Sequence, residues 1–350
     1  MATDKTQLEE LSQRFKRFAE FECHNSSPLY EKLSLGISKD QELLKLSSRS
    51  LHGPVPNLFL AAVHYLLLKG NDHTLSGFYP DIESEHDQDH DPYPRFRAFC
   101  LENSGAIDDI LRTRLVQTNE VQRSALLLPA FQFLASQTKR PLALVEIGTS
   151  AGLNLLWDRY AYDYGNGRIC GDKNSEVKLE CELRGELPPT LSHKLPETKF
   201  RVGLDLSPLN VNNEGDMLWL KALVWPEHKK RMALLESAVR IAQKHPLRLL
   251  KGDALEVLPD VLQTSPTDCT VCIVSTFTLN QFSKESHEKL GLLLTEAPKK
   301  ELYFVYAEYV EYSPGAYPEL HAVLRRGIQR EDKRLAKCEP HGEWLEWLYL

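Results

Sequence analysis

The sequence has no long hydrophobic run. Its longest apolar stretch, Leu58–Leu68, contains His64, and it is too short for a membrane-spanning helix, which needs roughly 20 apolar residues. The first ten residues lack the charge and apolar pattern of a signal or transit peptide. We therefore expect a soluble, cytoplasmic protein that does not associate with membranes.

The cysteines do not form a disulfide pattern. There are seven, an odd number, without the regular spacing of a disulfide framework. Cys269 and Cys272 form a lone C-x-x-C inside an apolar run. If that run is a strand, side chains three positions apart point to opposite faces and cannot bind one metal ion. The cysteines are predicted to be buried and free.

Basic patches are also scarce. The net charge is −7, and His228–Arg231 is the one notable basic run, which we interpret as a solvated helix face. We therefore expect a small-molecule substrate and no nucleic-acid partner. Glu85–Asp91 is rich in His and Asp, but these residues are crowded into a loop, so a solvated acidic loop is predicted and no metal site.

Residues 1–140 have a helical pattern, which predicts an all-helical N-terminal cap. Asn57–Lys69 is nearly all apolar and should be buried on most sides. Asn103–Ser136 is predicted to form one or two further helices. The polar residues Gln117, Asn119, Glu120 and Arg123 lie at helical spacing within it. They are either contacts to a substrate or ordinary surface pairs on a helix.

From about residue 141 the pattern changes to alternating strands and helices. Short apolar runs predict strands at Leu142–Ile147, Phe200–Leu204, Leu247–Leu250, Thr270–Ser275 and Leu302–Tyr306. Helical stretches between them indicate an α/β, doubly wound, mostly parallel sheet over residues 141–350. A β-hairpin is predicted as an insertion at Asn166–Pro188, and an antiparallel pair after Glu319.

Three strand ends carry residues suited to a nucleotide-type ligand. Glu146–Gly152 (E-I-G-T-S-A-G) follows the first strand and precedes a predicted helix at Leu153–Tyr160. Such a turn can direct backbone N–H groups at a ligand. Asp205 ends the second strand and Asp253 follows the third. Ligands of open α/β sheets bind at the carboxyl ends of strands, so the two carboxylates could accept hydrogen bonds from ribose hydroxyls and an adenine amine.

With these motifs, residues 141–308 resemble the class I S-adenosylmethionine-dependent methyltransferases, which have a Rossmann-like fold. The resemblance implies S-adenosylmethionine as cofactor. Asp205 would bind its ribose and Asp253 its adenine. The implied cofactor-binding residues are Glu146, Gly148, Ser150, Gly152, Asn154, Asp205, Asp253 and Ala254. The chain departs from the family pattern because Ser150 replaces its middle glycine and no Asn-Pro-Pro-Tyr motif follows the fourth strand.

Nearly the whole chain also resembles a bacterial family known as domain of unknown function twenty-three thirty-two. The matching stretches are residues 56–65, 117–124, 145–160, 222–227 and 341–347. This resemblance implies a fold rather than a reaction. For catalysis, Asn119, Glu120, Asn280 and Glu308 are candidates by their position near strand ends.

Two other functions stay open. Gly148–Gly152 also reads as G-x-S-x-G, the turn that carries the nucleophile of serine hydrolases. Ser150 would then need His287, His321 or His341 as its base. Against this, the chain contains no Asp-Gly pair and no HGGG-like loop. Alternatively, the domain binds a ligand or another protein without catalysis. The leading hypothesis is a methyltransferase that acts on a small molecule.

Overall fold

The computed structural model describes residues 2–70, 74–82, 90–165, 167, 169–311 and 315–349, and of residues 2–5 only the backbone. The predicted solvated loop at Glu85–Asp91 lies outside the described residues, apart from His90 and Asp91. The chain divides into two compact units. The first contains Met1–Thr118 and Asn213–Met232, and the second contains Asn119–Asn212 and Ala233–Leu350.

All described elements of the first unit are helical. They are α1 (Ala2–Arg17), η1 (Phe18–Cys23), α2 (Pro28–Ile37), α3 (Gln41–Ser47), α4 (Val55–Leu68), η2 (Ser76–Phe78), α5 (Tyr93–Glu102), α6 (Ser104–Thr113), α8 (Glu214–Ala222) and the beginning of α9 (Lys229–Lys244). Helix α4 is the central one, since ten of its residues are buried. Its His64 is fully buried between two acceptors, the Ala222 carbonyl oxygen at 3.1 Å and Asp81 Oδ2 at 2.8 Å.

Residues 213–232 belong to the helical unit because their side chains hydrogen-bond to it. Trp219 Nε1 donates to the Leu115 carbonyl oxygen at 2.9 Å. Glu227 accepts from Ser27 Oγ at 2.7 Å. The predicted solvated face at His228–Arg231 is only partly correct. Lys229 and Lys230 are exposed, whereas His228 and Arg231 are half-buried, because His228 contacts Ser26 and stacks on Trp225.

The second unit is built on a nine-stranded mixed sheet, so the predicted α/β class with a large parallel sheet is confirmed. Its strands are β1 (Leu142–Ile147), β5 (Glu182–Gly185), β6 (Thr198–Asp205), β7 (Arg248–Lys251), β8 (Thr270–Thr276), β9 (Glu301–Glu308), β10 (Glu319–Arg326), β11 (Gln329–Cys338) and β12 (Trp344–Trp347). Their order is β5-β12-β11-β10-β9-β8-β1-β6-β7. The five strands from β9 to β7 are parallel. The predicted antiparallel pair near the C-terminus is β10 and β11.

The chain order reverses at β1. Strands β6 and β7 lie on one side of it, and β8 and β9 lie on the other. Because the five strands are parallel, their carboxyl ends share one edge of the sheet. Ligands of open α/β sheets bind outside this edge, at the point where the strand order reverses. In this chain that point lies between β1 and β8.

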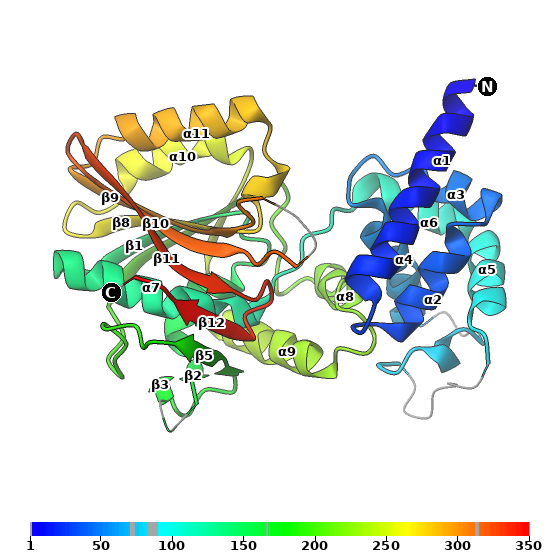
Figure 1. The fold of residues 1–350 in the computed structure, drawn as a ribbon, viewed down its shortest axis with the longest axis horizontal. Helices are drawn as coiled ribbons and strands as arrows, with labels where there is room; N and C mark the ends of the chain where they lie inside the picture. The colour runs from blue at the N-terminus through cyan, green and yellow to red at the C-terminus, as the bar shows by residue number, and fades with distance from the viewer. Residues whose placement is uncertain are drawn as a thin grey trace. The chain divides into compact units, whose positions relative to one another are not determined.

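Helices cover both faces of the sheet (Figure 1). Helices α10 (Ala254–Thr264) and α11 (Lys284–Glu296) lie on one face, and α7 (Ser124–Thr138) lies on the other. The core under α10 and α11 is formed by alternate strand residues such as Val145, Ile273 and Phe304. All seven cysteines are buried and free, as predicted.

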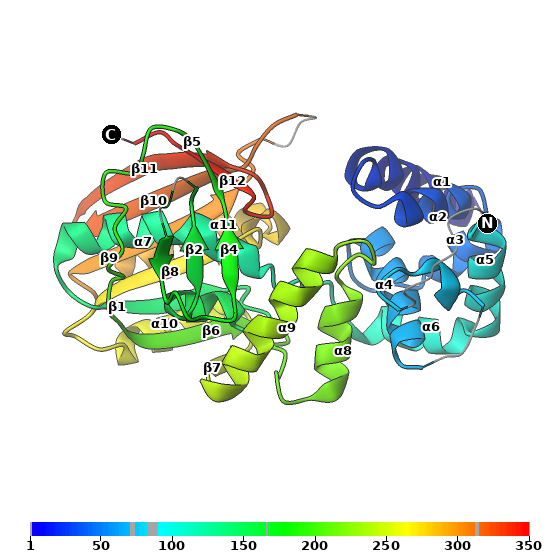
Figure 2. The same ribbon diagram turned by 90° about the horizontal axis from the view of Figure 1, so that it is seen from below.

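The insertion after β1 differs from the predicted hairpin at Asn166–Pro188. It is a three-stranded sheet in the order β3-β2-β4, made of β2 (Ala161–Asp163), β3 (Ile169–Gly171) and β4 (Lys178–Glu180). The sequence pattern missed β2, which begins before the predicted range and pairs with both other strands. This small sheet lies on the α7 side of the main sheet (Figures 1 and 2), where Tyr164 donates to the Ala125 carbonyl oxygen of α7.

Two predicted helices are also corrected. The segment after the glycine turn is a 3-10 helix, η4 (Leu153–Arg159). Side chains bind carbonyl oxygens that an α-helix would use internally: Tyr160 donates to the Leu153 oxygen, and Arg201 to the Leu155 oxygen. Residues 114–120 are not helical, and only η3 (Val121–Arg123) forms a short 3-10 turn before α7.

Candidate functional site

The glycine turn after β1 packs closely against its neighbours. Gly148 and Gly152 have φ of +74° and +77°, which favours glycine. A Cβ atom on Gly148 would lie 2.1 Å from Thr278 Oγ1, and one on Gly152 would lie 2.9 Å from Leu247 and Leu249. The two glycines are therefore required both by the backbone conformation and by the close approach of these side chains.

Asp205 links the ends of three adjacent strands. Its Oδ2 accepts from the Ser150 N–H of the glycine turn at 2.8 Å, and its Oδ1 accepts from Ser207 N–H at 2.9 Å. Its main-chain carbonyl accepts from Gly252 N–H, after β7, at 2.9 Å. The structure therefore brings the predicted residues Ser150, Asp205 and Asp253 to one edge of the sheet.

The backbone N–H groups of the turn are not directed at a ligand, contrary to the sequence-based expectation. Asn119 Oδ1 accepts from Ala151 N–H at 3.2 Å and from Leu153 N–H at 3.1 Å. The other N–H groups of residues 148–152 bind Asp205 and the carbonyl oxygens of Leu204 and Thr149. The turn is thus held by the protein itself, and Asn119, named above as a catalytic candidate, fixes its shape.

Two more predicted residues lie inside the fold beneath the turn. Asn154 accepts from Ser124 Oγ at 2.7 Å and donates to the Glu120 carbonyl oxygen. Glu146 is buried and accepts from Thr149 Oγ1 at 2.6 Å. Burial raises the pKa of Glu146 to about 8, with a further rise from the Asp205 charge, against the lowering effect of Thr149. Glu146 therefore holds its proton at neutral pH.

The end of β7 is open to solvent. Asp253 is exposed, and its Oδ1 caps helix α10 by accepting from Leu255 N–H at 2.8 Å. Ala254 begins that helix. Leu206, directly after Asp205, is 63% exposed. The sequence analysis did not single out Leu206, although an apolar residue in the polar turn L-D-L-S was visible in it.

The ends of β8 and β9 carry a second carboxylate site. Glu308 is 7% exposed, and its Oε1 accepts from Leu279 N–H at 2.8 Å. Its Oε2 has no hydrogen-bond partner among the described residues. Asn280 contributes through its main chain, because the backbone N–H groups of Thr278 and Asn280 lower the pKa of the Glu308 carboxyl.

Burial outweighs these hydrogen bonds and raises the pKa of Glu308 to about 7, while Arg123 lowers it. Arg123 lowers the pKa of Glu146 as well. The Arg123 guanidinium stacks on the Phe277 ring, 4.2 Å from its centroid. Phe277 has φ of +54°, which is rare for a bulky residue. Strained residues of this kind concentrate at functional sites.

The residues of a serine hydrolase are in less favourable positions. Ser150 is 2% exposed, although its φ of +53° resembles a strained turn. His321 is bound on both ring nitrogens, by Glu319 and by Asp332. His341 lies 3.6 Å from Glu120.

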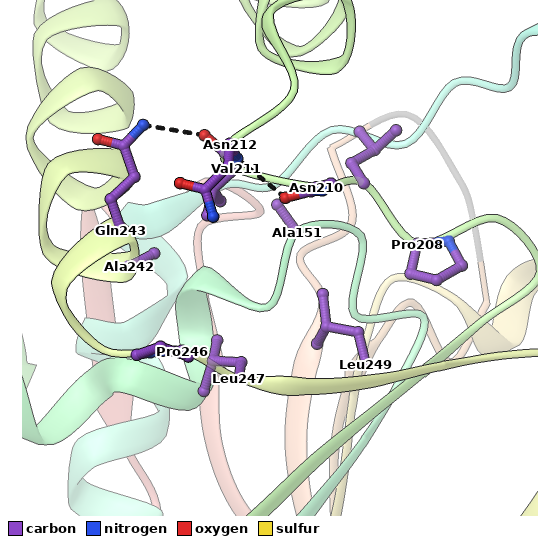
Figure 3. Close-up of a pocket in the computed structure, with 11 residues that line it drawn as sticks. Ala151, Pro208, Asn210, Val211, Asn212, Ala242, Gln243, Pro246, Leu247 and Leu249 are labelled. Carbon is purple, nitrogen blue, oxygen red and sulfur yellow. Dashed lines mark hydrogen bonds between the residues drawn. The ribbon is translucent and has the colours of Figure 1, made fainter.

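A cavity of about 360 Å³ adjoins the glycine turn (Figure 3). Ala151, Leu247 and Leu249 form its apolar part, and Asn210 and Gln243 contribute amides. Gln243 donates to the Val211 carbonyl oxygen at 2.9 Å. The cavity has no charged side chain in its lining, and Asp205 and Asp253 do not line it. It lies beside the strand-end carboxylates rather than among them.

Within the described part of the chain, no group of three or more His, Cys, Asp or Glu side chains is placed to hold a metal ion. None of the helices described there has the length and apolar character needed to cross a bilayer.

A family model described as an uncharacterized protein conserved in bacteria, DUF2332, matches residues 12–347. A search of curated proteins finds no match to the sequence.

Proposed function

The chain belongs to the DUF2332 family of uncharacterized bacterial proteins, and we propose that it is an S-adenosylmethionine-dependent methyltransferase. The observation that carries the proposal is the position of Asp205. Its carboxylate and carbonyl bind the turn after β1, the end of β6 and the turn after β7. An adenosyl ligand needs polar groups on these three strand ends within reach of one crevice.

The strand order supports a Rossmann-like fold for the second unit. Numbered along the chain, the five parallel strands follow the order 3-2-1-4-5, which is that of the doubly wound dinucleotide-binding sheets. The next strand, β10, is antiparallel, where those sheets continue with a parallel sixth strand. The proposed crevice depends on β1, β6 and β7 and is unaffected by this difference.

The residues at the crevice fit the adenosine part of such a cofactor. The Asp205 carboxylate, at the end of β6, would accept hydrogen bonds from the ribose hydroxyls. The exposed Leu206 side chain offers an apolar surface for a purine ring. The exposed carboxylate of Asp253 can accept from its amine. The turn Gly148–Gly152, whose shape is held by Asn119 and Asp205, would face the sugar and the amino-acid part.

The bound cofactor would supply an electrophilic methyl group. The protein would contribute mainly by placing a nucleophile in line with it, since proximity accounts for much of the rate in such transfers. We infer a small-molecule acceptor, because the net charge of −7 does not favour a polyanionic one. A protein of this kind would act in the cytoplasm.

The test is calorimetry with S-adenosylmethionine and with its demethylated product. The wild type should bind both. Leu206→Ala should weaken binding about tenfold through loss of apolar contact. Leu292→Ala is the matched control, since Leu292 is 60% exposed on α11, and its binding should equal that of the wild type. Asp253→Asn keeps a good helix cap and should weaken binding through loss of the negative charge.

Two outcomes would replace the proposal. If neither compound binds and a fluorophosphonate probe labels Ser150, the protein is a serine hydrolase. If neither compound binds and Ser150 is not labelled, a non-catalytic ligand-binding or interaction protein is the better interpretation. Equal binding by the wild type and by the Leu206 variant would move the cofactor site away from the end of β6.

A further inference from the structure

The Glu308 carboxylate is buried, and its hydrogen bonding is incomplete among the described residues. Its Oε1 is held by the Leu279 N–H at 2.8 Å, while Oε2 is buried without a partner among the described residues. Leaving a buried acceptor unpaired costs free energy, so such a group calls for an explanation. The carboxylate is fixed by one oxygen and has the other available.

The position of Glu308 is next to the reversal of strand order. It is the last residue of β9, and it binds the turn that follows β8, which includes η5 (Leu279–Gln281). Thr278 of that turn packs directly on Gly148. Glu308 is therefore connected through one turn to the glycine turn of the proposed cofactor site.

The charged surroundings of Glu308 come from two further elements. Arg123, in η3, lowers its pKa. On β10, Glu319 is the register partner of Glu308 and is itself paired with His321 and Arg334. Burial is the dominant influence and leaves the pKa of Glu308 at about 7. A proton acceptor works best when its pKa is near the working pH.

The turn that covers Glu308 holds a strained residue. Phe277 precedes Thr278 and has φ of +54°, a conformation that costs a bulky residue free energy. Its main-chain N–H donates to the Ala307 carbonyl oxygen at 3.0 Å, and the Arg123 guanidinium lies over its ring. Phe277 therefore makes the turn beside Glu308 a strained part of this edge of the sheet.

We propose that Glu308 is the catalytic proton acceptor, and that the methyl acceptor is a small molecule with a reactive O–H or N–H group. This inference rests on the proposed methyltransferase function. The acceptor's proton moves to Glu308 Oε2. The lone pair on the acceptor's oxygen or nitrogen forms the bond to the methyl carbon, and the electron pair of the broken carbon–sulfur bond remains on sulfur. The turn at residues 277–281 opens to admit the acceptor.

The first experiment asks whether Glu308 is reactive in the native protein, without turnover. A water-soluble carbodiimide with glycine ethyl ester is applied at pH 7, and the modified carboxyls are located by mass spectrometry. Ordinary carboxyls are ionised at this pH and react slowly. Glu308 should be modified faster than Glu331, an exposed carboxyl on β11. If Glu308 reacts only in the unfolded protein, its carboxyl is inaccessible in the folded state and has a structural role, and the proposal fails.

The second experiment uses Glu308→Gln, which keeps an oxygen for the Leu279 N–H. Its affinity for S-adenosylmethionine should equal that of the wild type. With a panel of phenols, alcohols and primary amines, its kcat should fall at least 100-fold, and the rise of kcat with an apparent pKa near 7 should disappear. Glu331→Gln should retain both kcat and the pH profile.

The two proposals fail in different ways. If the wild type does not bind S-adenosylmethionine, the methyltransferase function is wrong, whatever the labelling of Glu308. If the cofactor binds and Glu308→Gln turns over normally, or if turnover occurs only with acceptors that have no removable proton, the role of Glu308 is wrong and the methyltransferase function stands.

Discussion

The two halves of the strand-end edge use their polar groups differently. At the ends of β1, β6 and β7, Asp205 and Asn119 bind the turns together, and the backbone N–H groups of the glycine turn are paired. At the ends of β8 and β9, Glu308 keeps a buried oxygen without a described partner, and Phe277 is strained. A rigid, fully bonded region suits ligand binding, whereas an incompletely bonded region with a raised pKa suits chemistry.

The largest effect is expected where the two halves touch. Gly148→Ala places a Cβ against Thr278 and keeps a positive φ, and should lower the free energy of unfolding by about 3 kcal/mol or more. Urea unfolding measures this. Gly291→Ala is the control, because Gly291 lies in helix α11 and a Cβ added there would meet no atom within 4 Å. This variant should raise the free energy of unfolding by up to about 1 kcal/mol. Equal effects would mean that the halves are not in contact.

Asp205→Ala tests the bonded half alone. It removes the acceptor of two backbone N–H groups and should destabilise by about 2–3 kcal/mol, measured by urea unfolding. Asp253→Ala removes one helix cap and should cost about 1 kcal/mol. If the two variants are equally stable, Asp205 does not join the strand ends.

Glu146→Gln tests the raised pKa within the bonded half. In the wild type the folded protein keeps the Glu146 proton up to about pH 8, while the unfolded chain loses it near pH 4.3. The contribution of Glu146 to the free energy of unfolding therefore falls as the pH rises between those values. The variant, which keeps an acceptor for Thr149, should gain on the order of 2 kcal/mol relative to wild type between pH 5 and pH 8. A difference that does not change with pH would show that Glu146 has an ordinary pKa.

The smallest effect on stability is expected at the solvent edge. Leu206→Ala should change the free energy of unfolding by less than about 0.5 kcal/mol, because the side chain is 63% exposed. A thermal melt without ligand measures it. A large loss would mean that Leu206 packs in the folded protein and is not available to a ligand.

The sequence alone determined the five parallel strands and the identity of their ends. Local apolar runs located Leu142–Ile147 at its observed bounds and the other four predicted strands within two residues of theirs. A parallel strand that is buried on both faces is a continuous run of apolar residues and can therefore be found from the local sequence. Gly148–Gly152, Asp205 and Asp253 were identified for the same reason, since each follows a strand directly.

Only the tertiary structure decided how the side chains are used. The acceptor for the glycine turn is Asn119, 32 residues from Ala151 in the chain, and Glu308 Oε1 is held by a turn 29 residues away. Burial, and with it the raised pKa of Glu146 and Glu308, arises from the packing of several elements at once. The local pattern of apolar residues gives no information on such long-range contacts. The paired and unpaired polar groups could therefore be distinguished only in the folded chain.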